Sequence, residues 1–432
     1  MMKKVIALLL AAILAVSMAA AFTGCDKNTE KGRVYYLNFK PEADEAWQAL
    51  AAEYTEETGI EVKVYTAASG NYAEVLKGEM AKQDAPTLFQ CGNAQSLKDW
   101  GDYCLDFTDT EVLKEMTTSD FNLVDESGAV KAIGYCYEAF GIIVNKTLLR
   151  QAGFEVSDLC DFSSLQAAAE DIHARSAELG FDAFASSGLE SSSSWRFSGH
   201  LANMPLFYEF RDENITDQPA TIKGTYLSAY KNVWDLYIQN SAVAPTELIN
   251  TTCDMGRDEF GTGKAVFWQQ GTWEYANLVG PQYNMDPEEL QMIPIYCGVE
   301  GEEQAALCRG TENCWAVNAK AKDADIQATL DFLKWVVSSD LGTTMMAEQF
   351  GLIPFKAAKE SPNVFCEDAN KLVDAGKYNV TWAFKYTPNV AQWRAGVVAA
   401  LADYSAGNGQ WSAVETAFVD GWAAQYAEQN AN

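Results

Sequence analysis

The sequence predicts an α/β fold, and three patterns between residues 33 and 91 support this prediction. Apolar residues recur at the spacing of a helix face at Trp47, Leu50, Ala51 and Tyr54. Gly59 follows them, and glycine commonly ends a helix in the left-handed conformation. Residues 60–64 then alternate apolar and charged side chains, as a half-buried strand does. With a strand at 33–39, these segments form a βαβ unit, which implies a parallel sheet covered by helices.

The same pattern continues along the chain. A helix at 71–82 and a strand at 87–91 suggest a second βαβ unit. Two later helices carry core stripes, at Ile326, Leu330, Leu333 and Val337 and at Val414, Phe418 and Trp422. A serine-rich tract at 186–194 is expected to be a loop. With 432 residues, 48% of them apolar, the chain is large enough for two or more domains.

Residues 1–24 have the features of a secretion signal. Lys3 and Lys4 precede an apolar stretch at 5–22, which ends in small residues. Residues 22–25, Phe-Thr-Gly-Cys, resemble a bacterial lipobox, so we expect cleavage before Cys25 and lipidation of that cysteine. Residues 25–31 would then tether the lipid to the first strand. A cleaved signal without lipid and a retained membrane helix are the alternatives.

The chain is strongly acidic. Its formal charge is −29, and removal of 1–24 with its two lysines changes this to −31. Such a charge disfavours binding to nucleic acid or to an anionic membrane surface. Nine cysteines follow Cys25, with no CxxC motif and only two histidines in the chain, so we expect no metal site and no cofactor. We expect most of these cysteines to be buried and unpaired, with a bond from Cys308 to Cys297 or Cys314 as the alternative.

Several segments, in their order along the chain, resemble family 1 extracellular solute-binding proteins, the group that includes the maltose-binding and multiple-sugar-binding proteins. The matching segments are YTEETGIEVKV at 54–64, GIIVNK at 141–146, FGTGKAV at 260–266, QGTW at 270–273, FLKWVVSS at 332–339 and GLIP at 351–354. The chain departs from the family pattern at 86–89, where it has Pro-Thr-Leu-Phe, at Val144, and at 156–161.

The resemblance implies a two-lobed fold like that of periplasmic binding proteins. Each lobe would be a mixed, mostly parallel sheet flanked by helices, with crossovers near 138–144, 309–315 and 354–356. Lobe 1 would comprise 32–140 and 314–354, and lobe 2 would comprise 141–313 and 355–432. The implied function is that of a monomeric binding protein on the extracellular face of the cell membrane. It would capture an oligosaccharide by hinge closure and deliver it to the permease of an ABC transporter.

A sugar offers apolar CH faces to aromatic rings and hydroxyls to planar polar groups. Four tryptophans flanked by polar residues are therefore candidate ring platforms: Trp195, Trp273, Trp382 and Trp393. The resemblance favours Trp273 and Trp393 among them, and Trp268 is a weaker candidate. Core packing is the alternative for each one. We assign six tryptophans on helical stripes to the core: Trp47, Trp100, Trp234, Trp335, Trp411 and Trp422.

Polar candidates follow strand ends, where open α/β sheets bind ligands. They are Asn38 and Lys40 after the first strand, Asn93 and Gln95 after the strand at 87–91, and Glu138, Arg309 and Glu312 near the crossovers. For Glu138, Arg309 and Glu312 the alternative is an ion pair across the hinge. The resemblance matches Glu138 to a carboxylate that contacts sugar in maltose-binding relatives.

Two other functions stay open. The acidic charge allows a binding protein for a polyamine or another cationic solute. A surface enzyme that cleaves carbohydrate has no supporting motif, because the chain has no GxSxG, HExxH, Walker or dinucleotide-binding pattern. His173 is expected to be an exposed helix residue, and His200 is a candidate for lining the site. We therefore expect no catalytic residue.

Overall fold

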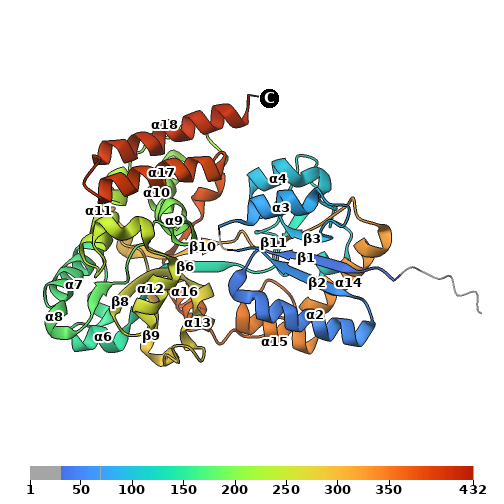
Figure 1. The fold of residues 1–432 in the computed structure, drawn as a ribbon, viewed down its shortest axis with the longest axis horizontal. Helices are drawn as coiled ribbons and strands as arrows, with labels where there is room; N and C mark the ends of the chain where they lie inside the picture. The colour runs from blue at the N-terminus through green and yellow to red at the C-terminus, as the bar shows by residue number, and fades with distance from the viewer. Residues whose placement is uncertain (1–30, 69, 432) are drawn as a thin grey trace, which may run out of the picture.

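The computed structural model describes residues 31–68 and 70–431, which form two lobes built around one β-sheet each (Figure 1). The predicted signal peptide, the lipid acceptor Cys25 and residues 26–30 of the tether lie outside the described residues. The fold is the α/β, two-lobed architecture that the sequence predicts.

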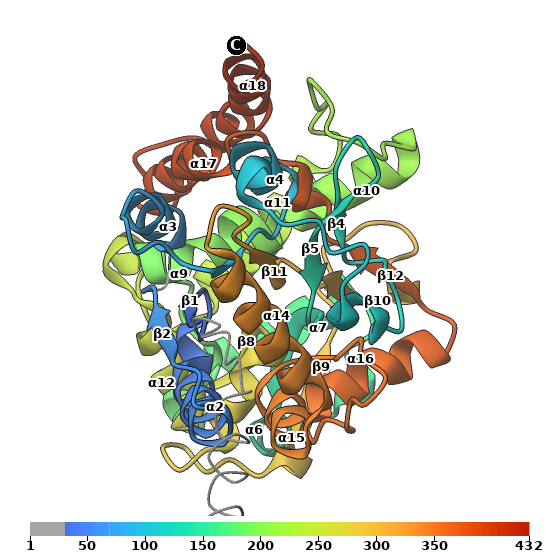
Figure 2. The same ribbon diagram turned by 90° about the vertical axis from the view of Figure 1, so that its right-hand side faces the viewer.

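Lobe 1 surrounds a sheet with the strand order β2-β1-β3-β11-β5-β4. The strands are β1 (Val34–Asn38), β2 (Val62–Thr66), β3 (Leu88–Gln90), β4 (Leu123–Val124), β5 (Val130–Gly134) and β11 (Cys314–Val317). The helices of this lobe are α2 (Asp44–Thr58), α3 (Tyr72–Met80), α4 (Ala94–Trp100), α5 (Glu111–Lys114), α14 (Asp323–Ser338) and α15 (Asp340–Gln349). Figure 2 shows α14 crossing this lobe, with α2 and α15 below it.

Lobe 2 surrounds a sheet with the order β12-β10-β6-β8-β7, and β9 also pairs with β6. The strands are β6 (Glu138–Asn145), β7 (Asp182–Phe184), β8 (Ala265–Gly271), β9 (Leu290–Ile293), β10 (Ala305–Gly310) and β12 (Tyr378–Thr381). The helices are α6 (Lys146–Gln151), α7 (Phe162–Ala174), α8 (Ser176–Leu179), α9 (Ser191–Trp195), α10 (Asn203–Glu213), α11 (Leu227–Gln239), α12 (Cys253–Gly261), α13 (Tyr275–Val279), α16 (Val364–Asp374), α17 (Val390–Ser405) and α18 (Trp411–Gln429).

A two-stranded antiparallel ribbon joins the lobes, and we call it the hinge ribbon. One strand runs from β5 into β6 and the other from β10 into β11, with pairs such as Cys314 to Gly134 and Gly310 to Glu138. Leu352 pairs with Tyr137 beside it. The ribbon makes the central pairs of both sheets antiparallel, so the sheets are mixed but less parallel than we expected. The expected boundary at 140/141 falls inside β6, because this strand begins in lobe 2 at Glu138.

Local sequence signals explain several element ends. Helix α2 ends at Gly59, whose φ of 68° is the left-handed cap that the sequence predicts. The serine tract at 186–194 is only partly a loop, because Glu190 accepts a hydrogen bond from the backbone N–H of Ser192 and starts α9. The expectation of a loop there was therefore wrong over residues 191–194.

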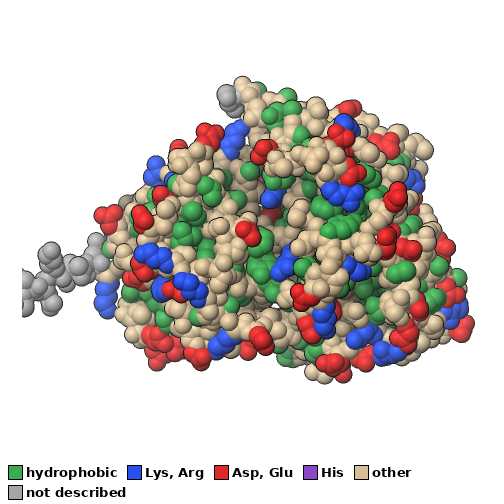
Figure 3. All heavy atoms as spheres, turned by 180° about the vertical axis from the view of Figure 1, so that it is seen from behind, with side chains coloured by type: hydrophobic (Ala, Val, Ile, Leu, Met, Phe, Trp, Pro, Cys, Tyr) green, Lys and Arg blue, Asp and Glu red, His purple; other side chains and the backbone are tan. Residues whose placement is uncertain are grey.

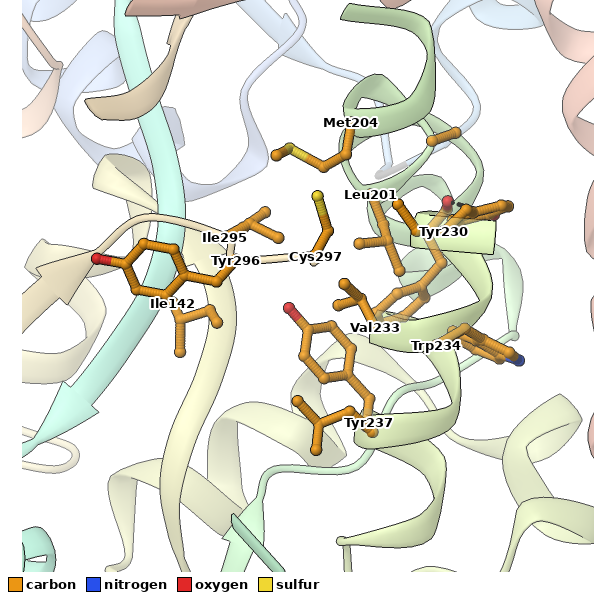
Figure 4. Packing of buried hydrophobic residues seen from close by; sticks show 14 of the residues in the cluster. Ile142, Leu201, Met204, Tyr230, Val233, Trp234, Tyr237, Ile295, Tyr296 and Cys297 are labelled. Atoms are coloured by element: carbon orange, nitrogen blue, oxygen red, sulfur yellow. Dashed lines mark hydrogen bonds between the residues drawn. The ribbon is translucent and has the colours of Figure 1, made fainter. Parts of the chain in front are cut away.

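The predicted core stripes lie in the core. Val414, Phe418 and Trp422 of α18 are each at most 1% exposed. On α14, Leu333 and Val337 are buried while Ile326 and Leu330 are only partly buried. Figure 4 shows part of the core of lobe 2, in which Val233 and Tyr237 of α11 lie on the side of Ile295 and Cys297, whereas the ring of Trp234 points to the other side of this helix.

Four of the six tryptophans assigned to the core are buried: Trp47, Trp234, Trp411 and Trp422. Trp100 and Trp335 are only partly buried, and the indole N–H of Trp335 donates to Glu57 at the surface. The nine cysteines that the structure describes are all unpaired, and eight of them are buried. Cys308 contacts Met204 instead of Cys297 or Cys314.

The acidic side chains are spread over both lobes (Figure 3). Asp and Glu side chains alternate on this face with a smaller number of Lys and Arg side chains, which suits a solubilising charge better than a single docking patch. Among the described residues, no helix is long and apolar enough to cross a membrane.

Candidate functional site between the lobes

The region between the two lobes, beside the hinge ribbon, is called the interlobe site, and its residues are described in turn below. The lobes also touch beyond the ribbon, because the Lys98 ammonium of α4 donates to the Gln429 carbonyl at 3.1 Å and to Asn430 Oδ1 at 3.3 Å. Both α4 and the end of α18 lie at the top of Figure 1. The two lobes are therefore in contact through α4 and the end of α18, on one side of the interlobe site.

Lys40 and Glu138 form a buried ion pair at the base of the interlobe site. Lys40 Nζ lies 2.7 Å from Glu138 Oε1 and 3.0 Å from Glu42 Oε1. Glu138 Oε2 accepts from Asn313 Nδ2 at 2.5 Å. Burial alone would lower the pKa of Lys40, but the Glu138 and Glu42 carboxylates outweigh it and raise that pKa well above its usual range. In this structure Glu138 forms the ion pair across the hinge that the sequence analysis gives as the alternative to sugar contact.

Asn38 is also used within the protein. Its Nδ2 donates to the Lys40 carbonyl at 2.8 Å and to Thr66 Oγ1 at 3.0 Å, and its Oδ1 accepts from the Lys40 backbone N–H. The side chain is fully buried. In this conformation Asn38 fixes the turn that directs Lys40 toward the hinge.

Asn93 and Glu312 join the start of α4 to the hinge ribbon. Asn93 Oδ1 caps α4 by accepting from the Ser96 backbone N–H at 2.9 Å, and its Nδ2 donates to Glu312 Oε1 at 3.1 Å. Gly92 allows this approach, since a Cβ there would lie 2.2 Å from the Glu312 carbonyl oxygen. Gln95 Nε2 donates to Asp99, which leaves Gln95 Oε1 buried without a partner.

Six rings of lobe 2 lie together beside the hinge ribbon, and we call them the aromatic wall: Phe140, Trp195, His200, Trp273, Trp382 and Phe384. His200 is central, since its ring stacks on Phe140 at 4.1 Å and contacts Trp195 at 4.9 Å and Trp273 at 5.3 Å. Trp195 and Trp273 are 6.0 Å apart and partly exposed, whereas Trp382 and Phe384 are buried. The wall thus offers two accessible indoles backed by buried rings.

Glycines let two of these indoles lie close to the backbone. A Cβ on Gly271 would lie 2.2 Å from the Trp273 ring, and one on Gly310 would lie 2.5 Å from the Trp382 ring. Trp273 is oriented further by the hydrogen bond from its Nε1 to Gln270 Oε1, at 2.9 Å. A π-helical turn, η4 (Arg196–Leu201), follows α9 and carries His200 into the centre of the wall.

Trp393 does not join the aromatic wall. It is 2% exposed, packs edge-on against Phe418 and Trp422 of α18, and donates from Nε1 to the Phe418 carbonyl at 2.9 Å. Its ring offers no face to a ligand here, because its side of α17 faces α18. Trp268 is likewise fully buried and stacks on Phe260.

Arg309 is held away from the aromatic wall. Its guanidinium lies 4.7 Å from the Tyr137 ring centre, and its Nη2 is 3.5 Å from Asn370 Oδ1 of α16. His173 lies on α7 with a 41% exposed side chain and contacts Asp182 at 2.8 Å, so it belongs to a different surface of lobe 2.

The sequence did not identify several groups of this site: Gln90, Phe140, Asn313, Phe384 and Arg394. Residues of this site also have buried polar atoms without a protein partner, namely Gln90 Oε1, His200 Nδ1, Asn313 Oδ1, Trp382 Nε1 and Arg394 Nε. Burial, helped by the Arg394 and Arg196 charges, lowers the pKa of His200 well below its usual range, so the ring is neutral at pH 7. Buried polar atoms normally have partners, so these are candidates for pairing with a polar ligand.

The described residues include no group of three or more His, Cys, Asp or Glu side chains arranged to hold a metal ion.

A separate polar cavity of about 650 Å³ lies on lobe 2 between α10, α11 and Gly298, and shares no residue with the interlobe site. Its polar lining includes Arg211, Asp212, Tyr226 and Asn232.

Solved structures of the same fold include RafE in complex with raffinose, with a TM-score of 0.70 and 16% identity over 92% of this chain and 99% of that one. The GacH receptor of Streptomyces glaucescens, studied without ligand and with acarbose, has a TM-score of 0.69 and 18% identity over 93% and 99%. A sugar transporter protein of Bacillus licheniformis in complex with stachyose has a TM-score of 0.67 and 17% identity over 90% and 100%.

A comparison with curated protein sequences gives no match. The family described as bacterial extracellular solute-binding protein matches residues 49–373, which include most of both lobes and the hinge ribbon. The chain belongs to this family of bacterial extracellular solute-binding proteins.

Proposed function

We propose that this protein captures an oligosaccharide at the interlobe site and delivers it to an ABC importer. The observation that carries the proposal is the pair of partly exposed indoles, Trp195 and Trp273, beside buried polar atoms that have no partner. Indole faces stack on the CH faces of sugars, while unpaired amide and imidazole atoms pair with hydroxyls. This combination suits a sugar better than a purely apolar solute or a polyamine.

The solved structures of the same fold support the same ligand class. The three described above were determined with raffinose, acarbose and stachyose, which are all oligosaccharides or analogues of them. At 16% to 18% identity these structures show the fold alone, so the ligand class of this chain rests on the aromatic wall.

We infer closure of the two lobes over the sugar from the way the site residues are divided between the lobes. The aromatic wall belongs to lobe 2, whereas Gln90 and Asn93 belong to lobe 1. A sugar that touches both sets stabilises the arrangement in which the lobes are together, because only that arrangement completes its contacts. The closed complex is then the form that docks on a membrane permease.

We assign the protein to the outer face of the cell membrane, held there by lipid on Cys25. The lipobox-like residues 22–25 support this assignment. Two acyl chains, at about 0.8 kcal/mol for each buried CH₂, are sufficient for stable anchoring. The protein acts as a monomer, and its partners are the oligosaccharide and the permease.

We propose that the protein binds the sugar without catalysing a reaction on it. The carboxylates near the aromatic wall are already engaged, Glu138 with Lys40 and Asn313, and Glu312 with Asn93. A glycosidase would need one carboxylic acid and one carboxylate positioned on either side of a sugar bond. Incubation with the bound oligosaccharide should therefore give no cleavage products by mass spectrometry.

Tryptophan emission during a sugar titration tests this function. The soluble chain beginning after Cys25 would be titrated with raffinose, stachyose, maltotriose, xylotriose, chitotriose and trigalacturonate. We expect saturable changes in emission with at least one sugar, and their loss in Trp195→Ala and Trp273→Ala. Trp335→Phe is the matched control, because this indole lies on α14 of lobe 1 and bonds to Glu57. Indifference to every sugar would contradict the proposal.

A further inference from the structure

Arg394 on α17 is a cation at the interlobe site without a protein partner. Its guanidinium carbon lies 5.6 Å from the Phe384 ring centre, and a Cβ on Gly199 would lie 2.8 Å from Arg394 Nη2. Its Nε is buried without a hydrogen bond, and it forms no ion pair with any residue that the structure describes. Arg394 is therefore packed onto the aromatic wall with its charge uncompensated.

A second arginine adds to the positive potential behind the wall. Arg196 is 1% exposed and donates only to neutral groups, the Gln269 carbonyl at 3.0 Å and Ser193 Oγ at 2.7 Å. Glu274 attracts Arg196 electrostatically but forms its ion pair with Arg257, at 2.7 Å, and none with Arg196. His200, next to both arginines, is neutral and also has an unpaired Nδ1.

These uncompensated cations stand out because of the composition of the chain. Asp and Glu number 60 against 31 Lys and Arg, so a carboxylate partner is easily supplied. Glu312 attracts Arg394 electrostatically, but it is bonded to Asn93 and makes no ion pair with Arg394. A buried or half-buried charge without a partner costs stability unless something else pairs with it.

We propose that the oligosaccharide bound by this protein is anionic, with a uronic acid residue whose carboxylate is received by Arg394. This inference rests on the proposed function and names the class of its ligand. The sugar ring stacks on Trp195 and Trp273 while the carboxylate meets the guanidinium, which matches carboxylate geometry with paired N–H donors. The low-dielectric surroundings of Phe384 and Gly199 strengthen that pair.

The test uses matched ligands. Isothermal titration calorimetry would compare di- and trisaccharides of galacturonate and glucuronate with their carboxyl-reduced counterparts, which have the same linkages and lengths. We expect at least one uronate to bind roughly 10- to 100-fold more tightly than its reduced counterpart, the range of one charge-assisted hydrogen-bonded pair. Arg394→Gln should remove that difference, because it weakens binding of the uronate and affects binding of the reduced sugar much less.

Two controls separate the possible causes. Lys385→Gln removes the same charge from the neighbouring turn η9 (Ala383–Tyr386) and should keep the preference for uronate. A thermal melt of Arg394→Gln should show a midpoint no lower than that of the wild type, because the substitution removes an uncompensated charge, and such a result excludes unfolding. Arg394→Lys keeps the charge but not the paired donors, and it should retain part of the preference.

The outcomes are distinct. Neutral sugars that bind as tightly as their uronate counterparts, or better, would overturn the inference and leave the oligosaccharide function intact. The same conclusion would follow if Arg394→Gln weakened both ligands equally, because Arg394 would then bind hydroxyls. Failure of every sugar, charged and neutral, would count against the proposed function itself.

Discussion

Lys40 and Glu138, 98 residues apart in the sequence, form a buried ion pair at 2.7 Å that joins the first strand of lobe 1 to the first strand of lobe 2. Both side chains are almost completely buried, and Asn313 on the crossing from β10 to β11 completes the network. The ion pair therefore connects two strands that must keep their relationship while the lobes move.

Glu138→Gln should destabilise the protein by about 3 kcal/mol, because removing one member of a buried pair leaves the other charge uncompensated. Glu42, whose side chain is 24% exposed, keeps only part of the attraction for Lys40. Glu42→Gln is the matched control and should cost about 1 kcal/mol or less. Urea unfolding followed by circular dichroism measures both. Equal costs for the two variants would contradict the assignment of Glu138 as the main partner of Lys40.

Asp368 should make stability fall as the pH rises from 4 to 7. Burial raises the pKa of this carboxyl to about 6, above its value of about 3.9 in the unfolded chain. The folded state therefore holds the proton more tightly, and this contribution is full below pH 4 and is lost as the pH rises through 6. Asp368→Asn keeps an acceptor for the Met292 N–H, which now lies 2.8 Å from Asp368 Oδ2.

The stability of Asp368→Asn relative to wild type should improve by about 1 to 2 kcal/mol between pH 4 and pH 7. Urea unfolding at the two pH values measures this change. A relative stability of Asp368→Asn that does not change with pH would contradict the raised pKa.

Trp393→Phe should lower stability without changing sugar affinity. The substitution removes the hydrogen bond to the Phe418 carbonyl and part of the packing between α17 and α18. We expect a loss of about 1 to 2 kcal/mol in urea unfolding. Trp195→Phe should show the opposite pattern, with weaker sugar binding and little change in stability. A large loss of affinity in Trp393→Phe would mean that this ring reaches the ligand in another conformation.

Lys98→Ala should weaken ligand binding by opening the lobes. Its contacts with Gln429 and Asn430 are among those that join the lobes away from the hinge ribbon. A surface contact of this kind contributes about 0.5 to 1 kcal/mol, so we expect an affinity reduced roughly two- to fivefold. Small-angle X-ray scattering should show a larger radius of gyration for the unliganded variant. Lys77→Ala, a basic residue of α3 in the same lobe, is the control, and an equal effect there would contradict the role of Lys98.

The sequence predicted the fold well because the fold depends on patterns with a fixed period. The stripe from Trp47 to Tyr54 and the cap at Gly59 define α2 directly, and the alternation after Gly59 defines β2 within two residues. The hinge ribbon was harder to predict, because a strand that passes from one sheet to the next has no turn to mark its boundary. For that reason the expected lobe boundary fell inside β6.

The site was only partly predictable, because spacing does not show which side of an element faces the other lobe. Trp393 and Arg394 are neighbours in the sequence, yet the indole packs against α18 and the guanidinium packs against Phe384. Lys40 follows β1 as predicted, and Glu138 is the first residue of β6, but their contact depends on the arrangement of the two lobes. His200 has no sequence signal beyond its place after a tryptophan and an arginine, and only the π-helical turn places it at the centre of the aromatic wall.

A crystal structure of the soluble chain grown with the tightest-binding oligosaccharide would show where the ligand lies. The proposed function predicts a sugar ring against Trp195 and Trp273, with polar contacts from both lobes. A sugar seated instead in the cavity lined by Arg211, Tyr226 and Asn232, with the interlobe site empty, would contradict it.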